Sequence, residues 1–148
     1  MELLRDADID PAPLAGKRVA ILGFGNQGRA QALNLNDSGV DLVVGLRHGS
    51  PREAAARNED LDVAPIEQAV AGADLVMMLA PDEVLGGLYQ AIEPRLRHGA
   101  ALGFSHGMAV HFGQIEPRGD LDVILVAPKG PGTALRSLYS EGKGMVAL

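Results

Sequence analysis

The residues with the clearest chemical signature are three glycines in the stretch G-F-G-N-Q-G, residues 23–28. They follow a short apolar run and precede a stretch with helical spacing. A turn of this kind leaves backbone N–H groups free for an anion, which the helix dipole also favours. Gly23 permits the tight turn, Gly25 lets the backbone approach a pyrophosphate, and Gly28 allows close helix–strand packing. The pattern in this context predicts dinucleotide binding, and a purely structural turn is the alternative.

A second signal is the basic loop after the second predicted strand. Arg47 follows Gly28 by 19 positions, where NAD-binding proteins usually place Asp or Glu for the ribose hydroxyls. Ser50 and Arg52 lie on the same loop. A guanidinium and a hydroxyl suit a 2′-phosphate, which carries extra charge and several acceptors. The loop therefore favours NADP(H), with a solvated basic loop as the alternative.

Three further clusters follow later predicted strands, where sheets of this kind bind their ligands. In the first, Pro81 sets a turn and Asp82 is expected to cap the next helix. The second contains His106 at a strand end and His111, which we interpret as a packing or turn residue. The third holds Lys129 among prolines and glycines in an otherwise apolar segment. His106 and Lys129 are therefore the candidates for catalysis.

The elements that must position these residues alternate along the chain. Apolar segments predict strands, and stretches with helical spacing predict helices between them, with Pro65 at a first helical position. The predicted strands are residues 17–22, 40–46, 61–64, 74–80, 100–104 and 122–127, and the predicted helices are 26–37, 53–58, 65–72 and 82–96. This alternation predicts an α/β fold of the Rossmann type, a doubly wound and mostly parallel sheet with helices on both faces. Fold analogy suggests the strand order 3-2-1-4-5-6.

Composition excludes several classes of function. With 148 residues, 47% of them hydrophobic and 22% charged, the chain is expected to form one globular domain. The absence of cysteine excludes disulfides and thiolate metal sites, and the net charge of −6 disfavours a nucleic-acid partner. No apolar run approaches the roughly 20 residues of a membrane helix, and the N-terminus does not resemble a signal peptide. We expect a cytoplasmic protein without a membrane partner.

Four longer motifs resemble a known family in order and spacing. They are D-S-G-V-D-L-V-V-G-L-R, L-A-P-D-E, F-S-H-G-M-A-V-H-F-G-Q-I and V-A-P-K-G-P-G, and the opening D-A-D-I-D fits as well. Together they resemble ketol-acid reductoisomerase, also called acetohydroxyacid isomeroreductase, over residues 6–148. The resemblance implies an NADPH-binding domain, with the cofactor contacted by Gly23, Phe24, Gly25, Asn26, Gln27, Gly28, Arg47, Ser50, Arg52, Pro81 and Asp82.

The same resemblance implies a reaction. His106 corresponds to an active-site histidine near the nicotinamide, and Lys129 to a lysine that helps hold the metal–substrate assembly. Family members convert 2-acetolactate or 2-aceto-2-hydroxybutyrate into 2,3-dihydroxy acids in isoleucine and valine biosynthesis. A Mg²⁺-dependent alkyl migration precedes reduction by NADPH.

The resemblance stops short of the metal site. The family draws its Mg²⁺ ligands from an all-helical C-terminal domain that is absent from this chain, and the acids present here are scattered, so no metal residue is predicted. The chain ends in an apolar run at residues 145–148, where a further strand is expected to begin, so we expect a piece of a longer protein. Such a piece is expected to bind NADPH without turning over the acetohydroxy acid, and its exposed apolar surface favours self-association into a homo-oligomer.

Two alternatives remain open at this stage. One is another NADP-dependent reductase of small hydroxy acids or imines, whose N-terminal half is similar. The other is a non-catalytic module that binds NADP(H).

Overall fold

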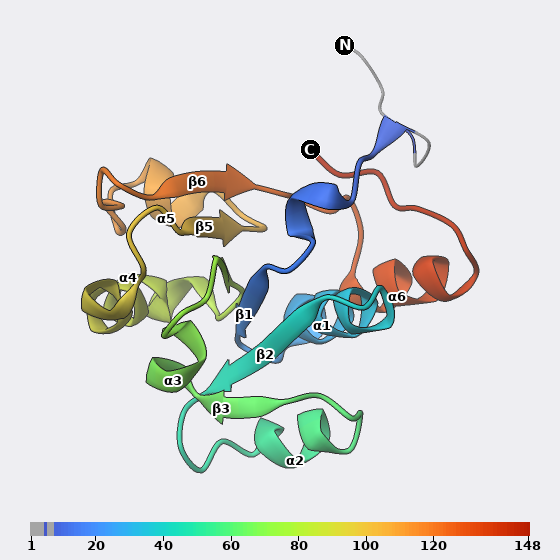
Figure 1. Ribbon diagram of the computed structural model, residues 1–148, viewed down its shortest axis with the longest axis horizontal. Coiled ribbons are helices and arrows are strands. Elements are labelled where there is room, and N and C mark those ends of the chain that lie inside the picture. The colour runs from blue at the N-terminus through green and yellow to red at the C-terminus, as the bar shows by residue number, and fades with distance from the viewer. Residues whose placement is uncertain (1–4, 6–7) are drawn as a thin grey trace.

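The computed structural model describes Arg5 and residues 8–148, and its centre is a single six-stranded sheet (Figure 1). All paired strands run parallel, in the order β3-β2-β1-β4-β5-β6, which confirms the predicted fold class and strand order. The strands are β1 (Arg18–Leu22), β2 (Asp41–Leu46), β3 (Val63–Pro65), β4 (Leu75–Met78), β5 (Ala101–Phe104) and β6 (Asp122–Leu125).

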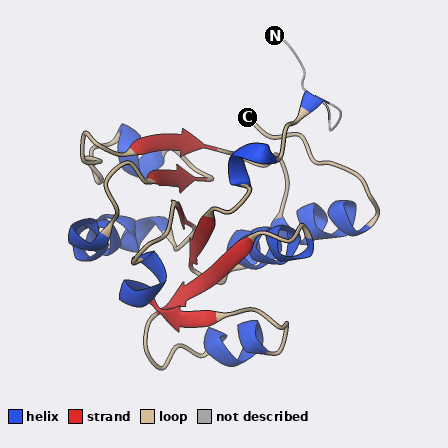
Figure 2. Cartoon of the chain, viewed as in Figure 1, coloured by secondary structure: helices blue, strands red, loops and turns tan. Residues whose placement is uncertain are grey.

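Helices connect these strands and lie on both sides of the sheet (Figure 2). They are α1 (Asn26–Asp37), α2 (Arg52–Arg57), α3 (Ile66–Val70), α4 (Asp82–Ile92), α5 (Met108–His111) and α6 (Gly132–Ser140), with the short 3-10 turns η2 (Ala12–Leu14) and η3 (Glu93–Arg95). Within the described residues, no helix is both long and apolar enough to cross a membrane.

The core consists of two apolar layers, because successive side chains of a strand point to opposite faces. On one face, Ala20 and Leu22 of β1 belong to a buried cluster with side chains of α3 and α4. On the other face, Val19 and Ile21 of the same strand pack with side chains of α1 and α2. Both faces of β1 are therefore buried, as a continuous apolar strand requires.

The edge strand β6 differs from the interior strands. Its four residues are all exposed, including Val123 at 48% and Leu125 at 51%. These two side chains pair in register with the buried Leu102 and Phe104 of β5, yet lack comparable cover. The apolar pattern of this segment therefore predicts the strand but not its exposure.

Two local predictions about helix starts were wrong. Asp82 is the first residue of α4, while Pro81 takes the cap position, so Asp82 does not cap the helix with its side chain. Its carboxylate lies instead in the first turn, where the helix dipole favours negative charge. Pro65 likewise ends β3 and occupies the cap position of α3, so it is not the first helical residue.

The C-terminal part of the chain departs most from expectation. Helix α6 was not predicted, because Gly132, Thr133, Ser137 and Ser140 lower its helical propensity. Residues 144–148 do not form a strand of the sheet and make only an isolated antiparallel bridge, Pro128 to Ala147. The hydrogen bonds of this bridge run between Ala127 and Leu148 and from the Lys129 N–H to the Val146 carbonyl oxygen.

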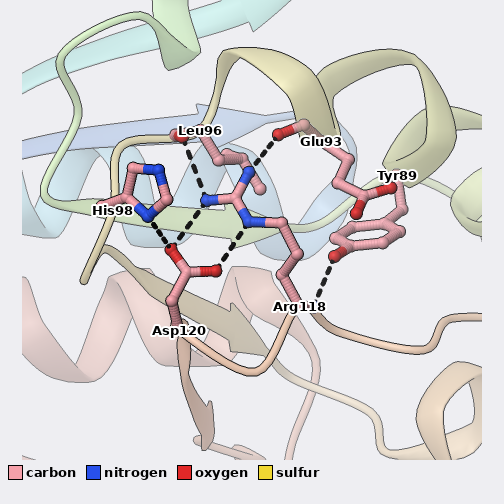
Figure 3. A network of polar contacts seen from close by, with 6 residues as sticks. All are labelled: Tyr89, Glu93, Leu96, His98, Arg118 and Asp120. Carbon is pink, nitrogen blue, oxygen red and sulfur yellow. Dashed lines mark hydrogen bonds and ion pairs between the residues drawn. The ribbon is translucent and has the colours of Figure 1, made fainter.

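A network of polar contacts around Arg118, called the arginine clasp below, lies at the end of the sheet where β5 and β6 begin (Figure 3). Nη1 of Arg118 donates to the Glu93 carbonyl oxygen at 2.6 Å, Nη2 donates to the Leu96 carbonyl oxygen at 3.2 Å, and the guanidinium also pairs with Asp120 at 2.7 Å. His98 Nδ1 lies 2.8 Å from the same carboxylate. Hydrogen bonds from Arg118 hold the pKa of Asp120 far below its usual range. The clasp joins the loop before β6 to η3 and Leu96, directly after α4.

Candidate functional site

The glycine turn lies between β1 and α1, and each glycine has a distinct steric environment. Gly23 has a φ of +106°, and a Cβ there would lie 2.7 Å from the Leu79 carbonyl oxygen. A Cβ on Gly28 would run into the carbonyl oxygen of Gly23. A Cβ on Gly25 meets no atom within 4 Å. Two of the glycines are therefore required by the fold itself, and Gly25 leaves open space beside the backbone.

Helix α1 begins in this turn with its backbone donors uncommitted. Gly25 takes the cap position without a side-chain hydrogen bond, and the first helical bond runs from Arg29 N to the Gly25 carbonyl. The N–H groups of Asn26, Gln27 and Gly28 precede that bond, so they have no acceptor within the helix. Free N–H groups at a helix start favour an anion such as a phosphate.

A cleft of about 930 Å³ opens beside the turn, at the carboxyl ends of β1, β2 and β4. The sheet order reverses direction at β1, so the cleft lies at the switch point where such sheets bind ligands. Most of the predicted cofactor residues line this cleft, namely Gly23, Phe24, Gly25, Asn26, Gln27, Arg47, Ser50, Arg52 and Pro81. Gly28, buried beneath the turn, and Asp82 are not among the lining residues.

The basic loop after β2 forms one side of the cleft. Arg47 directly follows the last residue of β2 and is exposed, and its side chain makes no ion pair with any residue that the structure describes. Arg52 behaves differently, because its Nη1 donates to the Phe24 carbonyl oxygen at 3.1 Å. Its backbone N–H also donates to Ser50 Oγ at 3.3 Å. Arg52 thus ties the basic loop to the glycine turn, while Arg47 keeps its charge free.

The opposite wall of the cleft is apolar, and this feature was missed from the sequence. It includes Val84, Leu88 and Ala91, spaced one turn apart on α4. A second stripe on the same helix, Leu85 and Ile92, is buried in the core. The two stripes together make α4 apolar on more than one face. A helix that packs on the core needs only one apolar face, so the second stripe was the sequence signal for an apolar cleft wall. An apolar wall in a cleft that also contains polar donors suits an aromatic ring of a ligand.

His106 and Lys129 are not among the residues that line this cleft. Both are exposed, one just after β5 and one after β6. His106 Nδ1 accepts a hydrogen bond from the Met108 N–H at 3.3 Å, and the Lys129 N–H donates to the Val146 carbonyl oxygen at 2.9 Å. The cleft and the predicted catalytic residues therefore both lie at the carboxyl ends of the strands, but His106 and Lys129 do not line the cleft.

A metal site does not accompany these residues. Among Arg5 and residues 8–148, no three His, Asp or Glu side chains gather into a group that fits an ion. Mg²⁺ prefers several oxygen ligands in octahedral geometry. The donor set described here does not fit that requirement.

Comparison with known proteins decides the family. The family model for the acetohydroxy acid isomeroreductase NADPH-binding domain matches residues 13–148. The chain belongs to this family. It is also similar to the structure of an NADH-preferring ketol-acid reductoisomerase from an uncultured archean, with 43% sequence identity and a TM-score of 0.94. That match covers 99% of this chain and 46% of the other, so this isomeroreductase domain spans about half the length of that relative.

More distant structures share the fold with this isomeroreductase domain. The 3-hydroxyisobutyrate dehydrogenase of Mycobacterium tuberculosis is 20% identical with a TM-score of 0.64, over 82% of this chain and 44% of its own. An imine reductase from Pseudomonas sp. is 18% identical with a TM-score of 0.60, over 80% of this chain and 43% of its own. At these identities the likeness concerns the fold alone. The family model and the 43% identical reductoisomerase structure together indicate an oxidoreductase domain that binds a nicotinamide cofactor.

Proposed function

We propose that this chain binds NADPH as the cofactor domain of a ketol-acid reductoisomerase. In the reaction of that enzyme family, bound NADPH supplies the hydride that reduces a ketone after alkyl migration in an acetohydroxy acid. The chain's own contribution is to hold and orient the dinucleotide, and to present His106 and Lys129 at the same edge of the sheet.

One observation carries the preference for the phosphorylated cofactor. Arg47 and Ser50 line the same cleft as the glycine turn. A diphosphate held by the amides of Gly25 and Asn26 places its adenosine ribose toward the end of β2. The free guanidinium of Arg47 then faces the 2′-position, where an anionic phosphate forms an ion pair with several hydrogen bonds and a neutral hydroxyl offers a single uncharged acceptor.

His106 and Lys129 act on the substrate side in this proposal. Each follows a strand that lies beyond β4 in the sheet, while the adenosine side of the cleft lies at β2. An extended dinucleotide that crosses the switch point therefore points its nicotinamide toward the β5 and β6 ends. There an imidazole and an ammonium group are suited to bind oxygen atoms of a small acid substrate.

We further propose that the isolated chain is catalytically incomplete. Its described residues offer no group of ligands for the divalent metal ion on which the family's migration step depends. The chain also spans 46% of the similar reductoisomerase structure. Incubation of the purified chain with acetolactate, Mg²⁺ and NADPH should leave the absorbance of NADPH unchanged, and steady oxidation of NADPH would contradict this.

Calorimetry with both nicotinamide cofactors tests cofactor binding and its preference. We expect the wild-type chain to bind NADPH more tightly than NADH. Arg47→Ala should weaken NADPH binding by about 10- to 100-fold, the loss expected for one or two hydrogen bonds to a charged group. NADH binding should change little, because NADH has no 2′-phosphate.

The matched control is Arg95→Ala, which removes the same charge from η3, well outside the cleft. It should leave both affinities unchanged. Equal affinity for the two cofactors in the wild type, or equal losses from Arg47→Ala, would overturn the NADPH preference. Failure to bind either cofactor would overturn the function.

A further inference from the structure

Two glutamines of α1, Gln27 and Gln31, connect this helix to the loops that follow β5 and β6. Gln27 and Gln31 lie four residues apart, so they share one face of the helix. Gln31 Nε2 donates to Gln27 Oε1 at 3.2 Å and to Ser105 Oγ at 2.9 Å. Gln27 Nε2 donates to the Gly130 carbonyl oxygen at 3.0 Å. All of these contacts are partly buried, and they form one continuous chain of hydrogen bonds.

The two ends of this chain lie next to the predicted catalytic residues. Ser105 directly precedes His106, and Gly130 directly follows Lys129. These partners are 74 and 103 positions away from the glutamines in sequence. Helix α1 therefore holds the loop after β5 through one glutamine and the loop after β6 through the other.

Asn26 strengthens the second attachment. Its Oδ1 accepts a hydrogen bond from the Thr133 N–H at 3.1 Å, at the start of α6. Gly132 lies so close to Asn26 that any side chain there would collide with the Asn26 backbone. The segment that carries Lys129 is thus fixed to the first turn of α1 at two points, Gly130 and Thr133.

These contacts reassign the side chain of Gln27. The family resemblance implies a cofactor contact at Gln27, but its side-chain amide is committed to Gly130 and Gln31. Its backbone N–H stays free for a phosphate, so the same residue serves the cofactor with its main chain and the neighbouring loop with its side chain.

We propose that Gln31, together with Gln27, is a positioning residue that sets the placement of His106 and Lys129 relative to the dinucleotide turn. The role of the two positioned residues rests on the proposed function, while the linkage itself rests on the hydrogen bonds. Each bond is worth a modest net free energy, and the side chains of His106 and Lys129 that it would position are exposed. Loss of the Gln31 side chain removes the bond to Ser105 directly, and it removes the bond to Gln27 Oε1 that orients the Gln27 amide toward Gly130.

Amide hydrogen exchange of the 148-residue chain, followed by NMR, tests the linkage. Two reporters are suited to it. The Met108 N–H bonds to the His106 ring, and the Lys129 N–H bonds to the Val146 carbonyl. Gln31→Leu keeps the size and helical propensity of the side chain but removes both hydrogen bonds. We expect exchange at both reporters to become about tenfold faster, as for the loss of one hydrogen bond that restrains local opening.

Single-arm variants separate the two attachments. Ser105→Ala should speed exchange at Met108 alone, and Gln27→Leu should speed it at Lys129 alone. Gln31→Glu should restore slow exchange at Met108, because its carboxylate accepts a hydrogen bond from the Ser105 hydroxyl. The matched control is Gln90→Leu, a change of the same kind at an exposed position of α4, and it should change neither reporter.

The buried strand β1 provides the check for global unfolding. If Gln31→Leu also speeds exchange at Ile21, the milder Ser105→Ala variant decides the question. Unchanged exchange at Met108 in Ser105→Ala, or equal effects of Gln31→Leu and Gln90→Leu, would overturn the proposal. A wild-type chain that does not bind NADPH would overturn the proposed function and leave the exchange result standing.

Discussion

The two ends of the parallel sheet use charged side chains in opposite ways. At the end where the strands begin, Asp74 accepts a hydrogen bond from the Arg18 N–H at 2.9 Å and pairs with Arg97, and Asp120 is enclosed by Arg118. At the end where the strands finish, Arg47 faces a cleft and makes no ion pair with the described residues. The carboxylates of Asp74 and Asp120 are paired within the protein at one end, whereas the guanidinium of Arg47 at the other end is available to a ligand.

This difference shows how one fold separates stability from binding. The Arg18 backbone hydrogen bond lowers the pKa of Asp74, and Arg118 lowers that of Asp120, so both carboxylates are stabilised in their charged form by internal partners. The cleft end instead keeps donors without internal acceptors, which suits a polyanionic ligand. Substitutions at the two ends should therefore separate into effects on unfolding and effects on affinity.

The largest effect is expected at Gly28, which packs against the glycine turn and also belongs to the helix start that offers N–H groups to a phosphate. Gly28→Ala forces a Cβ onto the Gly23 carbonyl oxygen, so the turn or the helix must move. We expect a loss of about 3 kcal/mol in the free energy of unfolding, as for overpacking against rigid backbone. Urea denaturation measures it.

Gly25→Ala is the matched comparison for that variant. Its Cβ meets no protein atom within 4 Å, so stability should be nearly unchanged while NADPH affinity falls. If Gly25→Ala destabilised the chain as much as Gly28→Ala, or left NADPH binding intact, the assignment of open space to the ligand would be wrong.

Arg52 gives the next largest effect, and it sharpens the contrast with Arg47. Because Arg52 binds the Phe24 carbonyl, its loss should disturb the turn that both cofactors share. Arg52→Ala should weaken NADPH and NADH binding alike, by about tenfold, the value of one charge-assisted hydrogen bond. Calorimetry that showed a loss for NADPH alone would make Arg52 a simple phosphate contact.

A third prediction concerns the opposite end of the sheet and its pH dependence. The pKa of Asp120 is lower in the folded chain than in the unfolded chain. Its stabilisation is therefore present above the unfolded value near 3.9 and is lost as the pH falls through the folded value. Urea midpoints measured from pH 6 down to pH 3 should decline less steeply in Asp120→Asn. NADPH affinity at neutral pH should be unchanged, and a loss of affinity would show that the two ends are coupled.

The smallest effect is expected on the exposed edge strand. Val123→Thr keeps a β-branched side chain and replaces an apolar atom at a position that is 48% exposed. The free energy of unfolding should change by less than about 0.5 kcal/mol. Sedimentation should reveal less self-association if the apolar edge drives it. A large loss of stability would mean that β6 is better covered in solution than its exposure indicates.

Much of the fold was predictable because its signals are local. A continuous apolar run such as residues 19–22 identifies a strand buried on both faces, and the alternation with helices implies parallel order. The glycine spacing at residues 23–28 likewise predicts a turn between strand and helix. Helix α6 escaped prediction because its residues carry weak helical propensity, and it packs against α1 through Gly132 and through the Arg136–Asp37 ion pair at 2.7 Å.

What the amino-acid sequence by itself determined was the type of each element and the chemistry of the residues at the strand ends. Only the tertiary structure decided which of those residues are free and which are already bonded. Arg47 and Arg52 look alike in the sequence, yet one is uncommitted and the other holds Phe24. Gln27 looks like a ligand contact, yet its amide binds Gly130, 103 positions away. Periodicity acts over a few residues, whereas a hydrogen-bond partner depends on which distant segments the completed sheet brings together.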